Sequence, residues 1–163
     1  MQQKRISILL IVAGALAALG IVALAAAYAP ALAGEIRAEN PQIPMIAEMY
    51  RFGLAGVWAS SLIVLYALGE YFRVSVRIGK GRAFCPENVK SLSRMAICLW
   101  VDGGLWLAAI FAPGLLFHFS IGPAWLLFLL VAMANFALGL LAWCLGWLLD
   151  RAVSLKQEND LTV

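Results

Sequence analysis

The chain has 163 residues, a length that allows a single domain, and a net charge of +3. Hydrophobic residues make up 64% of it and charged residues 13%, against about 25% charged in soluble domains. The mean hydropathy is +0.90. These values exclude a water-soluble helical bundle, which would need polar stripes at helical spacing. The small positive charge is explained by basic residues beside a membrane, so no direct nucleic-acid partner is expected.

Four apolar runs predict an all-α membrane protein with transmembrane helices at about 6–33, 52–72, 95–117 and 121–149. Lipid offers the backbone no hydrogen-bond partners, so an apolar run of about 18 or more residues indicates a spanning helix. The link between the third and fourth runs is the short string HFSIG, which makes these two helices an antiparallel hairpin. We expect one antiparallel four-helix bundle over residues 1–163.

The distribution of Lys and Arg predicts the orientation, because short cytoplasmic loops carry an excess of these residues. On one side of the predicted membrane segments lie only Arg37 and Arg51. The other ten Lys and Arg residues lie on the opposite side: Lys4, Arg5, Arg73, Arg77, Lys80, Arg82, Lys90, Arg94, Arg151 and Lys156. We therefore expect a multi-pass protein of the bacterial inner (cytoplasmic) membrane with both termini cytoplasmic. Its bilayer contacts would favour anionic lipid head groups.

The amino-terminal segment allows two interpretations. A basic start, an apolar run and the string Ala31–Leu32–Ala33 outline a signal peptide, but the run is about twice the usual core of about 7–15 residues. We favour an uncleaved first helix. Small residues recur in it at spacings of three and four: Ala13, Gly14, Ala17, Ala18, Gly20, Ala23 and Ala27. Such spacing lets helices approach closely, and packing within the bundle is favoured over a dimer face.

The segment from 73 to 94 is predicted to be a cytoplasmic helical hairpin. Residues 68–78 can continue the second helix, with Gly79 as a left-handed stop. Pro86 suits the first turn of a helix and Glu87 suits its positive end, so the third helix should begin near Pro86, before the membrane. The fourth helix should likewise run past Asp150 into the tail at 150–163.

No residue pattern in the chain indicates an enzyme or a cofactor. The spacing of Cys85, Cys98 and Cys144 fits no zinc motif, and a reducing cytosol disfavours disulfides. The one histidine, His118, lies in a predicted turn, where solvation is favoured over metal binding. The string RIGKGRAF lacks the spacing and the final Ser or Thr of a phosphate-binding loop. No catalytic or metal site is predicted.

We expect Asp102 to be the one charged residue within a predicted membrane segment, and this makes it a candidate functional residue. It lies fifteen residues before Phe117, and Asn135 lies fourteen after Ile121. On antiparallel helices the two side chains then have nearly the same depth. We predict that they share a hydrogen-bonded site, with Ser60 or Ser61 as a further member. Polar packing between helices is favoured over proton or ligand sensing and over transport.

Two segments carry a family resemblance. The string GKGRAFCPENVKSLSRMA resembles the pattern of small bacterial membrane proteins grouped as domain of unknown function 2975. The matching positions are Gly81, Phe84, Cys85, Glu87, Asn88 and Leu92. The closing string resembles the ending of the same family at Ala152, Leu155, Lys156, Glu158, Asn159, Asp160, Leu161, Thr162 and Val163. The resemblance extends over nearly the whole chain, although Cys85 replaces a serine common in that position.

The resemblance implies no established activity, but it implies a partner, because members resemble products encoded beside small helix-turn-helix regulators. We therefore expect a non-enzymatic module that binds or signals to such a cytoplasmic regulator. A small oligomeric transporter or channel with Asp102 in its path is the alternative, which a second buried charge would favour. An immunity or stress-tolerance role and a homo-oligomer also stay open.

The expected docking surface combines the hairpin with the tail, on which Lys90 and Arg94 face Glu158 or Asp160. Its residues are Phe84, Glu87, Asn88, Lys90, Leu155, Glu158, Asn159, Asp160, Leu161 and Val163. A frayed, solvated terminus is the competing interpretation of the tail.

Overall fold

The structure is a computed structural model that describes residues 2–28, 30–31, 34, 44–117 and 124–161. Apart from residues 80–85, every described residue is helical. The main elements are α1 (Gln2–Ala23), the π-helix η1 (Leu24–Tyr28), α3 (Pro44–Gly79), α4 (Pro86–Phe117) and α5 (Ala124–Leu161). Four of these helical segments are long and apolar enough to cross a membrane.

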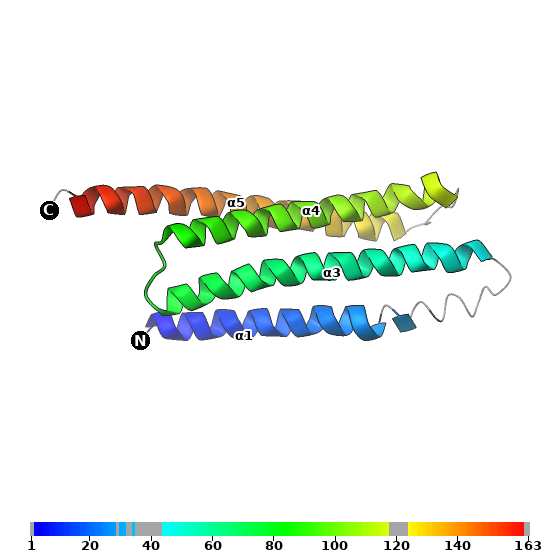
Figure 1. Ribbon diagram of the computed structural model, residues 1–163, viewed down its shortest axis with the longest axis horizontal. Helices are drawn as coiled ribbons and strands as arrows, with labels where there is room; N and C mark the ends of the chain where they lie inside the picture. The colour runs from blue at the N-terminus through cyan, green and yellow to red at the C-terminus, as the bar shows by residue number, and fades with distance from the viewer. Residues whose placement is uncertain (1, 29, 32–33, 35–43, 118–123, 162–163) are drawn as a thin grey trace.

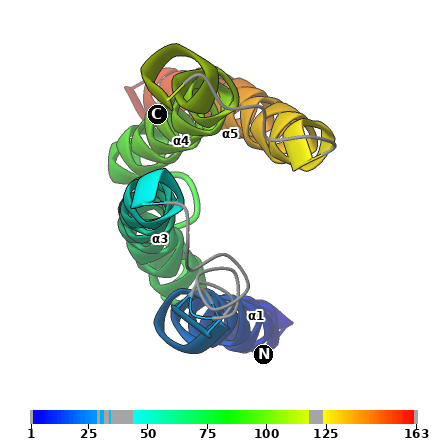
Figure 2. The same cartoon turned by 90° about the vertical axis from the view of Figure 1, so that its right-hand side faces the viewer.

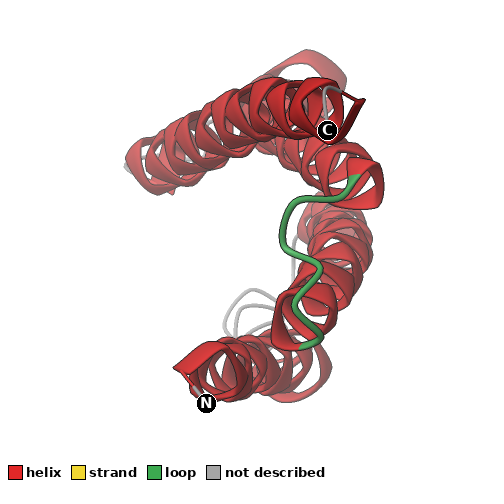
Figure 3. Ribbon diagram, turned by 90° about the vertical axis from the view of Figure 1, so that its left-hand side faces the viewer, coloured by secondary structure: helices red, strands yellow, loops and turns green. Residues whose placement is uncertain are grey.

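The helices lie side by side in an open curved row. Along this row α1 contacts α3, α3 contacts α4 and α4 contacts α5, and among the described residues no contact joins α1 to α4 or α5. Figure 1 shows the colours running left to right along α1 and α4 and right to left along α3 and α5. Figures 2 and 3, which look along the helix axes from the two ends, show an arc rather than a closed ring of helices.

The helix bounds confirm the predicted ends of the hairpin and revise the start of the second helix. α3 ends at Gly79 and α4 begins at Pro86, as the local signals indicated. α3 begins at Pro44 rather than near 52, since proline suits a first turn. α5 runs on to Leu161, which confirms that the fourth helix passes Asp150. The predicted turn HFSIG, with His118, lies outside the described residues.

The left-handed residue of the hairpin is Gly81, with φ of 75°, and not Gly79 as the sequence suggested. Gly79 is needed for another reason. A Cβ atom there would lie 2.6 Å from the Ser7 Oγ of α1, so a larger residue would separate the two helices. The buried Ser7 hydroxyl donates a hydrogen bond to the Ser75 carbonyl at 2.8 Å across the same contact.

Among the small residues of α1, Gly14 packs within the protein. A Cβ atom at Gly14 would lie 2.9 Å from the Tyr71 ring and 3.0 Å from the Phe72 ring. Tyr71 also donates a hydrogen bond to the Leu10 carbonyl, at 3.1 Å. Gly20, by contrast, has nothing within 4 Å of such an atom, and Ala13 and Ala17 are exposed. Internal packing therefore uses Gly14 and leaves other positions of the small-residue stripe, such as Ala13 and Ala17, exposed.

The α4–α5 contact is close where glycines face large side chains. A Cβ atom at Gly139 would lie 2.5 Å from the Trp100 ring, and one at Gly103 would lie 3.2 Å from the Ala132 carbonyl oxygen. Trp106 and Phe128 pack edge to face farther along, with ring centroids 5.2 Å apart. These contacts fix the register that brings the polar residues of the two helices together.

Candidate functional site

Asp102 and Asn135 meet between α4 and α5. The Asn135 side-chain amide donates to Asp102 Oδ2 at 2.9 Å and to its own helix at the Val131 carbonyl, at 3.2 Å. The hydrogen bond predicted by counting residues is therefore confirmed, while its role stays a prediction. Asp102 is only 1% exposed, and its second oxygen, Oδ1, has no hydrogen-bond partner among the described residues.

Ser60 belongs to the same polar site, whereas Ser61 does not. The Trp106 indole, one turn along α4 from Asp102, donates to Ser60 Oγ at 3.1 Å, and this links α3 to the site. The Ser61 hydroxyl instead donates to the Val57 carbonyl of its own helix, at 2.7 Å. Trp106 was missed because its indole N–H is a single donor in an otherwise apolar run. No local pattern in the sequence distinguishes Trp106 from the other tryptophans.

A second buried carboxylate, Glu70, corrects the prediction that Asp102 is the one charge in a membrane segment. Glu70 is 1% exposed and lies within the predicted span 52–72. Its Oε1 accepts hydrogen bonds from Arg73, on the next turn of α3, and from Arg94 of α4 at 3.2 Å. The pairing with Arg73 is visible in the sequence as an i, i+3 spacing; the pairing with Arg94 is not.

Arg77 joins α3 to the start of α4 through neutral acceptors. Its guanidinium donates to Ser91 Oγ at 3.1 Å, and to Asn88 Oδ1 and the Glu87 carbonyl, each at 3.3 Å. The Asn88 amide in turn donates to the Ala83 carbonyl at 2.8 Å and to the Arg82 carbonyl at 3.2 Å. Asn88 therefore holds the loop in place.

The prediction that Asn88 belongs to the docking surface is wrong. Its side chain is 1% exposed, and it forms hydrogen bonds with Arg77, Arg82 and Ala83 of the same hairpin. Other predicted docking residues do lie on the surface: Phe84, Glu87, Lys90, Leu155 and Glu158. Asn159, Asp160 and Leu161 belong to α5. Val163 lies outside the described residues.

The last turns of α5 project past the hairpin. Leu92 of α4 lies level with Gly146 of α5, since a Cβ atom at that glycine would be 3.4 Å from it. From this level α4 has six residues left to Pro86 and α5 has fifteen left to Leu161, so α5 extends roughly 14 Å farther. Figure 1 shows this projecting end at the left. Every side chain from Ser154 to Glu158 is exposed.

Arg94, which was expected to face the tail, pairs with Glu70 of α3. The expected pairing of Lys90 or Arg94 with the tail stays a prediction. The projecting segment of α5 and the basic hairpin thus form two neighbouring surfaces at one end of the molecule. No group of three or more His, Cys, Asp or Glu side chains lies together as metal ligands would in the part of the chain that the structure describes.

Comparisons with curated proteins and with solved structures gave no match. A family model does match, and it covers the hairpin, Asp102, Asn135 and the projecting end of α5, while α1 precedes the matched residues. The resemblance seen in the hairpin and in the closing string falls inside this match. The matched residues, 32–163, make up more than half of the chain, which therefore belongs to the family described as protein of unknown function (DUF2975).

Proposed function

We propose that this chain is a non-enzymatic module of the bacterial cytoplasmic membrane that binds a cytoplasmic protein, such as a small helix-turn-helix regulator. In this proposal the four helices cross the membrane as an antiparallel set with both termini inside. The observation that carries it is the end of α5, which extends past its neighbour α4 and exposes every side chain from Ser154 to Glu158.

An exposed, helical end of this kind suits capture of a partner. A helix that offers both apolar and charged side chains can bind in a groove of another protein. Leu155 is 63% exposed, and Lys156, Gln157 and Glu158 surround it with polar groups. Because the segment is already helical, binding costs less ordering entropy than capture by a flexible tail.

A truncation after Leu155 tests the docking role. The variant should insert normally, because the deleted residues from Lys156 to Glu158 are exposed and contribute little to packing. Membranes that contain the full chain should co-sediment a purified small helix-turn-helix regulator, and membranes with the truncated chain should not. A matched control retains the length of the tail but scrambles the order of residues 156–163.

Equal capture by the full and the truncated chains would end the docking role of this segment. Capture by the scrambled control at the level of the natural tail would show that charge or length alone is sufficient. Loss of membrane insertion after truncation would make the segment structural instead.

The proposed topology includes α1 as a retained helix. It is supported by the packing of α1 against α3, where Ser7 and Gly14 are both buried. The intact mass of the protein isolated from membranes should include residues 1–33. Reporters fused to either end should both report the cytoplasm. A mass that lacks these residues would establish the signal-peptide alternative.

A transporter or channel is the second candidate, and one observation favours it. Asp102 has a buried oxygen, Oδ1, that has no hydrogen-bond partner among the described residues, and it lies at the contact between α4 and α5. An intramembrane carboxylate is a candidate for an ion or proton path. Flux into liposomes that contain the purified protein, abolished by Asp102→Asn, would support this function. Absence of flux for protons and common ions would remove it.

A further inference from the structure

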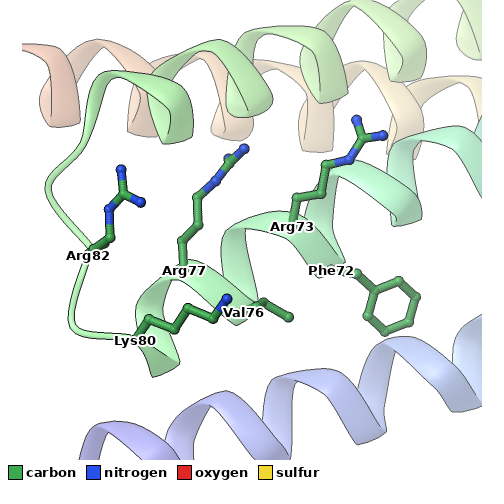
Figure 4. A pocket seen from close by; sticks show the side chains of 6 residues that line it. All are labelled: Phe72, Arg73, Val76, Arg77, Lys80 and Arg82. Atoms are coloured by element: carbon green, nitrogen blue, oxygen red, sulfur yellow. The ribbon is translucent and has the colours of Figure 1, made fainter.

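A basic pocket of about 420 Å³ lies along the last turns of α3, and nothing in the proposed function uses it. Figure 4 shows the side chains that line it: Phe72, Arg73, Val76, Arg77 and Lys80 of α3, and Arg82 of the following loop. The α3 residues are spaced by four in two adjacent rows, so they share one face of the helix. The loop that Asn88 holds places Arg82 beside them.

The pocket has an excess of positive charge. Four of its six lining residues are cationic and none is acidic. Two carboxylates lie just outside the pocket. Glu70 forms ion pairs with both Arg73 and Arg94, and the Glu87 carboxylate lies 4.0 Å from the Arg82 guanidinium. Arg77 donates its hydrogen bonds to neutral oxygen atoms, those of the Ser91 hydroxyl, the Asn88 amide and the Glu87 backbone carbonyl.

The polarity of the pocket changes along the helix axis. Phe72, the last residue of the predicted span 52–72, lies at one end, and Val76 lies one turn farther along. Lys80 and Arg82 lie at the other end, roughly 12 Å from Phe72 along the axis. If α3 crosses the membrane, its apolar end faces the acyl chains and its basic end faces the level of the head groups.

We propose that this pocket binds the phosphate of an anionic phospholipid, with Lys80, Arg82 and Arg77 around the head group and Phe72 and Val76 against the upper acyl chain. Basic pockets between membrane helices bind phospholipid head groups in this way. The proposal goes beyond the proposed function and does not depend on the end of α5. Inorganic phosphate shares the charged group but has no acyl chain to contact Phe72 and Val76.

The test measures binding of short-chain phosphatidylglycerol to the full-length protein in neutral detergent. The double variant Lys80→Gln/Arg82→Gln should bind the lipid roughly 30-fold more weakly, since each basic residue near a head group contributes on the order of 1 kcal/mol. Lys80→Gln alone should weaken binding roughly fivefold. The matched control is Lys4→Gln/Lys156→Gln, which removes two exposed basic residues outside the pocket.

The control should bind phosphatidylglycerol as the natural protein does, and phosphatidylcholine should bind weakly to every variant. Equal loss in the control would overturn the proposal, because the effect would then be one of net charge. Unchanged binding by the double variant, with a natural circular dichroism spectrum, would also overturn it. Displacement of the lipid by an equimolar amount of inorganic phosphate would overturn the lipid assignment in favour of free phosphate.

Discussion

Glu70 and Asp102 are both 1% exposed, and each has one oxygen without a hydrogen-bond partner among the described residues, yet their surroundings differ. Glu70 lies at the hairpin end between the guanidinium groups of Arg73 and Arg94. Asp102 is bonded by a neutral amide, that of Asn135. On α4, Arg94 and Asp102 are eight residues apart, roughly 12 Å along the axis.

The difference shows that burial alone does not make a carboxylate a functional candidate. The charge of Glu70 is balanced by two cations, so an electrostatic role in joining α3 to α4 accounts for it. In the part of the chain that the structure describes, the ion pairs do not include Asp102, and a charge in that position is costly in a membrane. The second buried charge therefore adds little support for a transport path, and Asp102 remains the residue to test.

The largest effect on stability is expected from Glu70→Gln. The change removes the acceptor charge that Arg73 and Arg94 share, and it should lower the free energy of unfolding by about 2 kcal/mol. The loss of stability should be no larger, because the Arg73 and Arg94 side chains are 59% and 55% exposed and water can hydrate them. Denaturation in mixed micelles measures it, and high salt should shrink the difference. Glu87→Gln, at an exposed residue, is the control; an equal loss there would remove the special position of Glu70.

A smaller effect is expected from Asn135→Leu. It removes the donor to Asp102 Oδ2 and leaves that oxygen buried, which should cost about 1 kcal/mol. A double-mutant cycle with Asp102→Leu should give a coupling free energy of about 1 kcal/mol between the two residues. Coupling near zero would mean that the hydrogen bond contributes nothing to the α4–α5 contact.

The smallest effect is expected from Asp102→Asn. The amide keeps the shape of the side chain and removes its charge, so the free energy of unfolding should change by less than about 0.6 kcal/mol, without dependence on salt. Flux and partner capture are then measured on the same preparation. Loss of either activity with unchanged stability would assign a function to the charge. A salt-dependent destabilisation like that of Glu70→Gln would instead erase the contrast between the two carboxylates.

Local signals in the sequence predicted the four long helices and the two helix ends that bound the hairpin. A long apolar run in lipid must form a helix, because the backbone has no other hydrogen-bond partners there. Gly79 is the last residue of α3, and Pro86 is the first residue of α4. Counting residues also predicted that Asp102 and Asn135 meet, because depth on paired helices follows from the rise per residue.

Lateral arrangement and burial were not predictable in the same way. The ion pair of Glu70 with Arg94 joins residues on two helices, and no pattern near Glu70 in the sequence predicts it. Asn88 was placed on the docking surface because a family motif does not tell a buried side chain from an exposed one. The order of helices in the row depends on close contacts such as Gly139 with Trp100, which periodicity does not reveal.

The open row has a mechanical consequence. Because each described helix contacts only its neighbours, separating α1 from α3 leaves every contact between α4 and α5 in place. A force applied to the amino-terminal end would therefore extract α1 first and peel the remaining helices in chain order, much as a linear array of repeats unravels from one end. A force on the end of α5 would instead have to separate α5 from α4 first, including the contact of Gly139 with Trp100, so the two ends should resist extraction unequally.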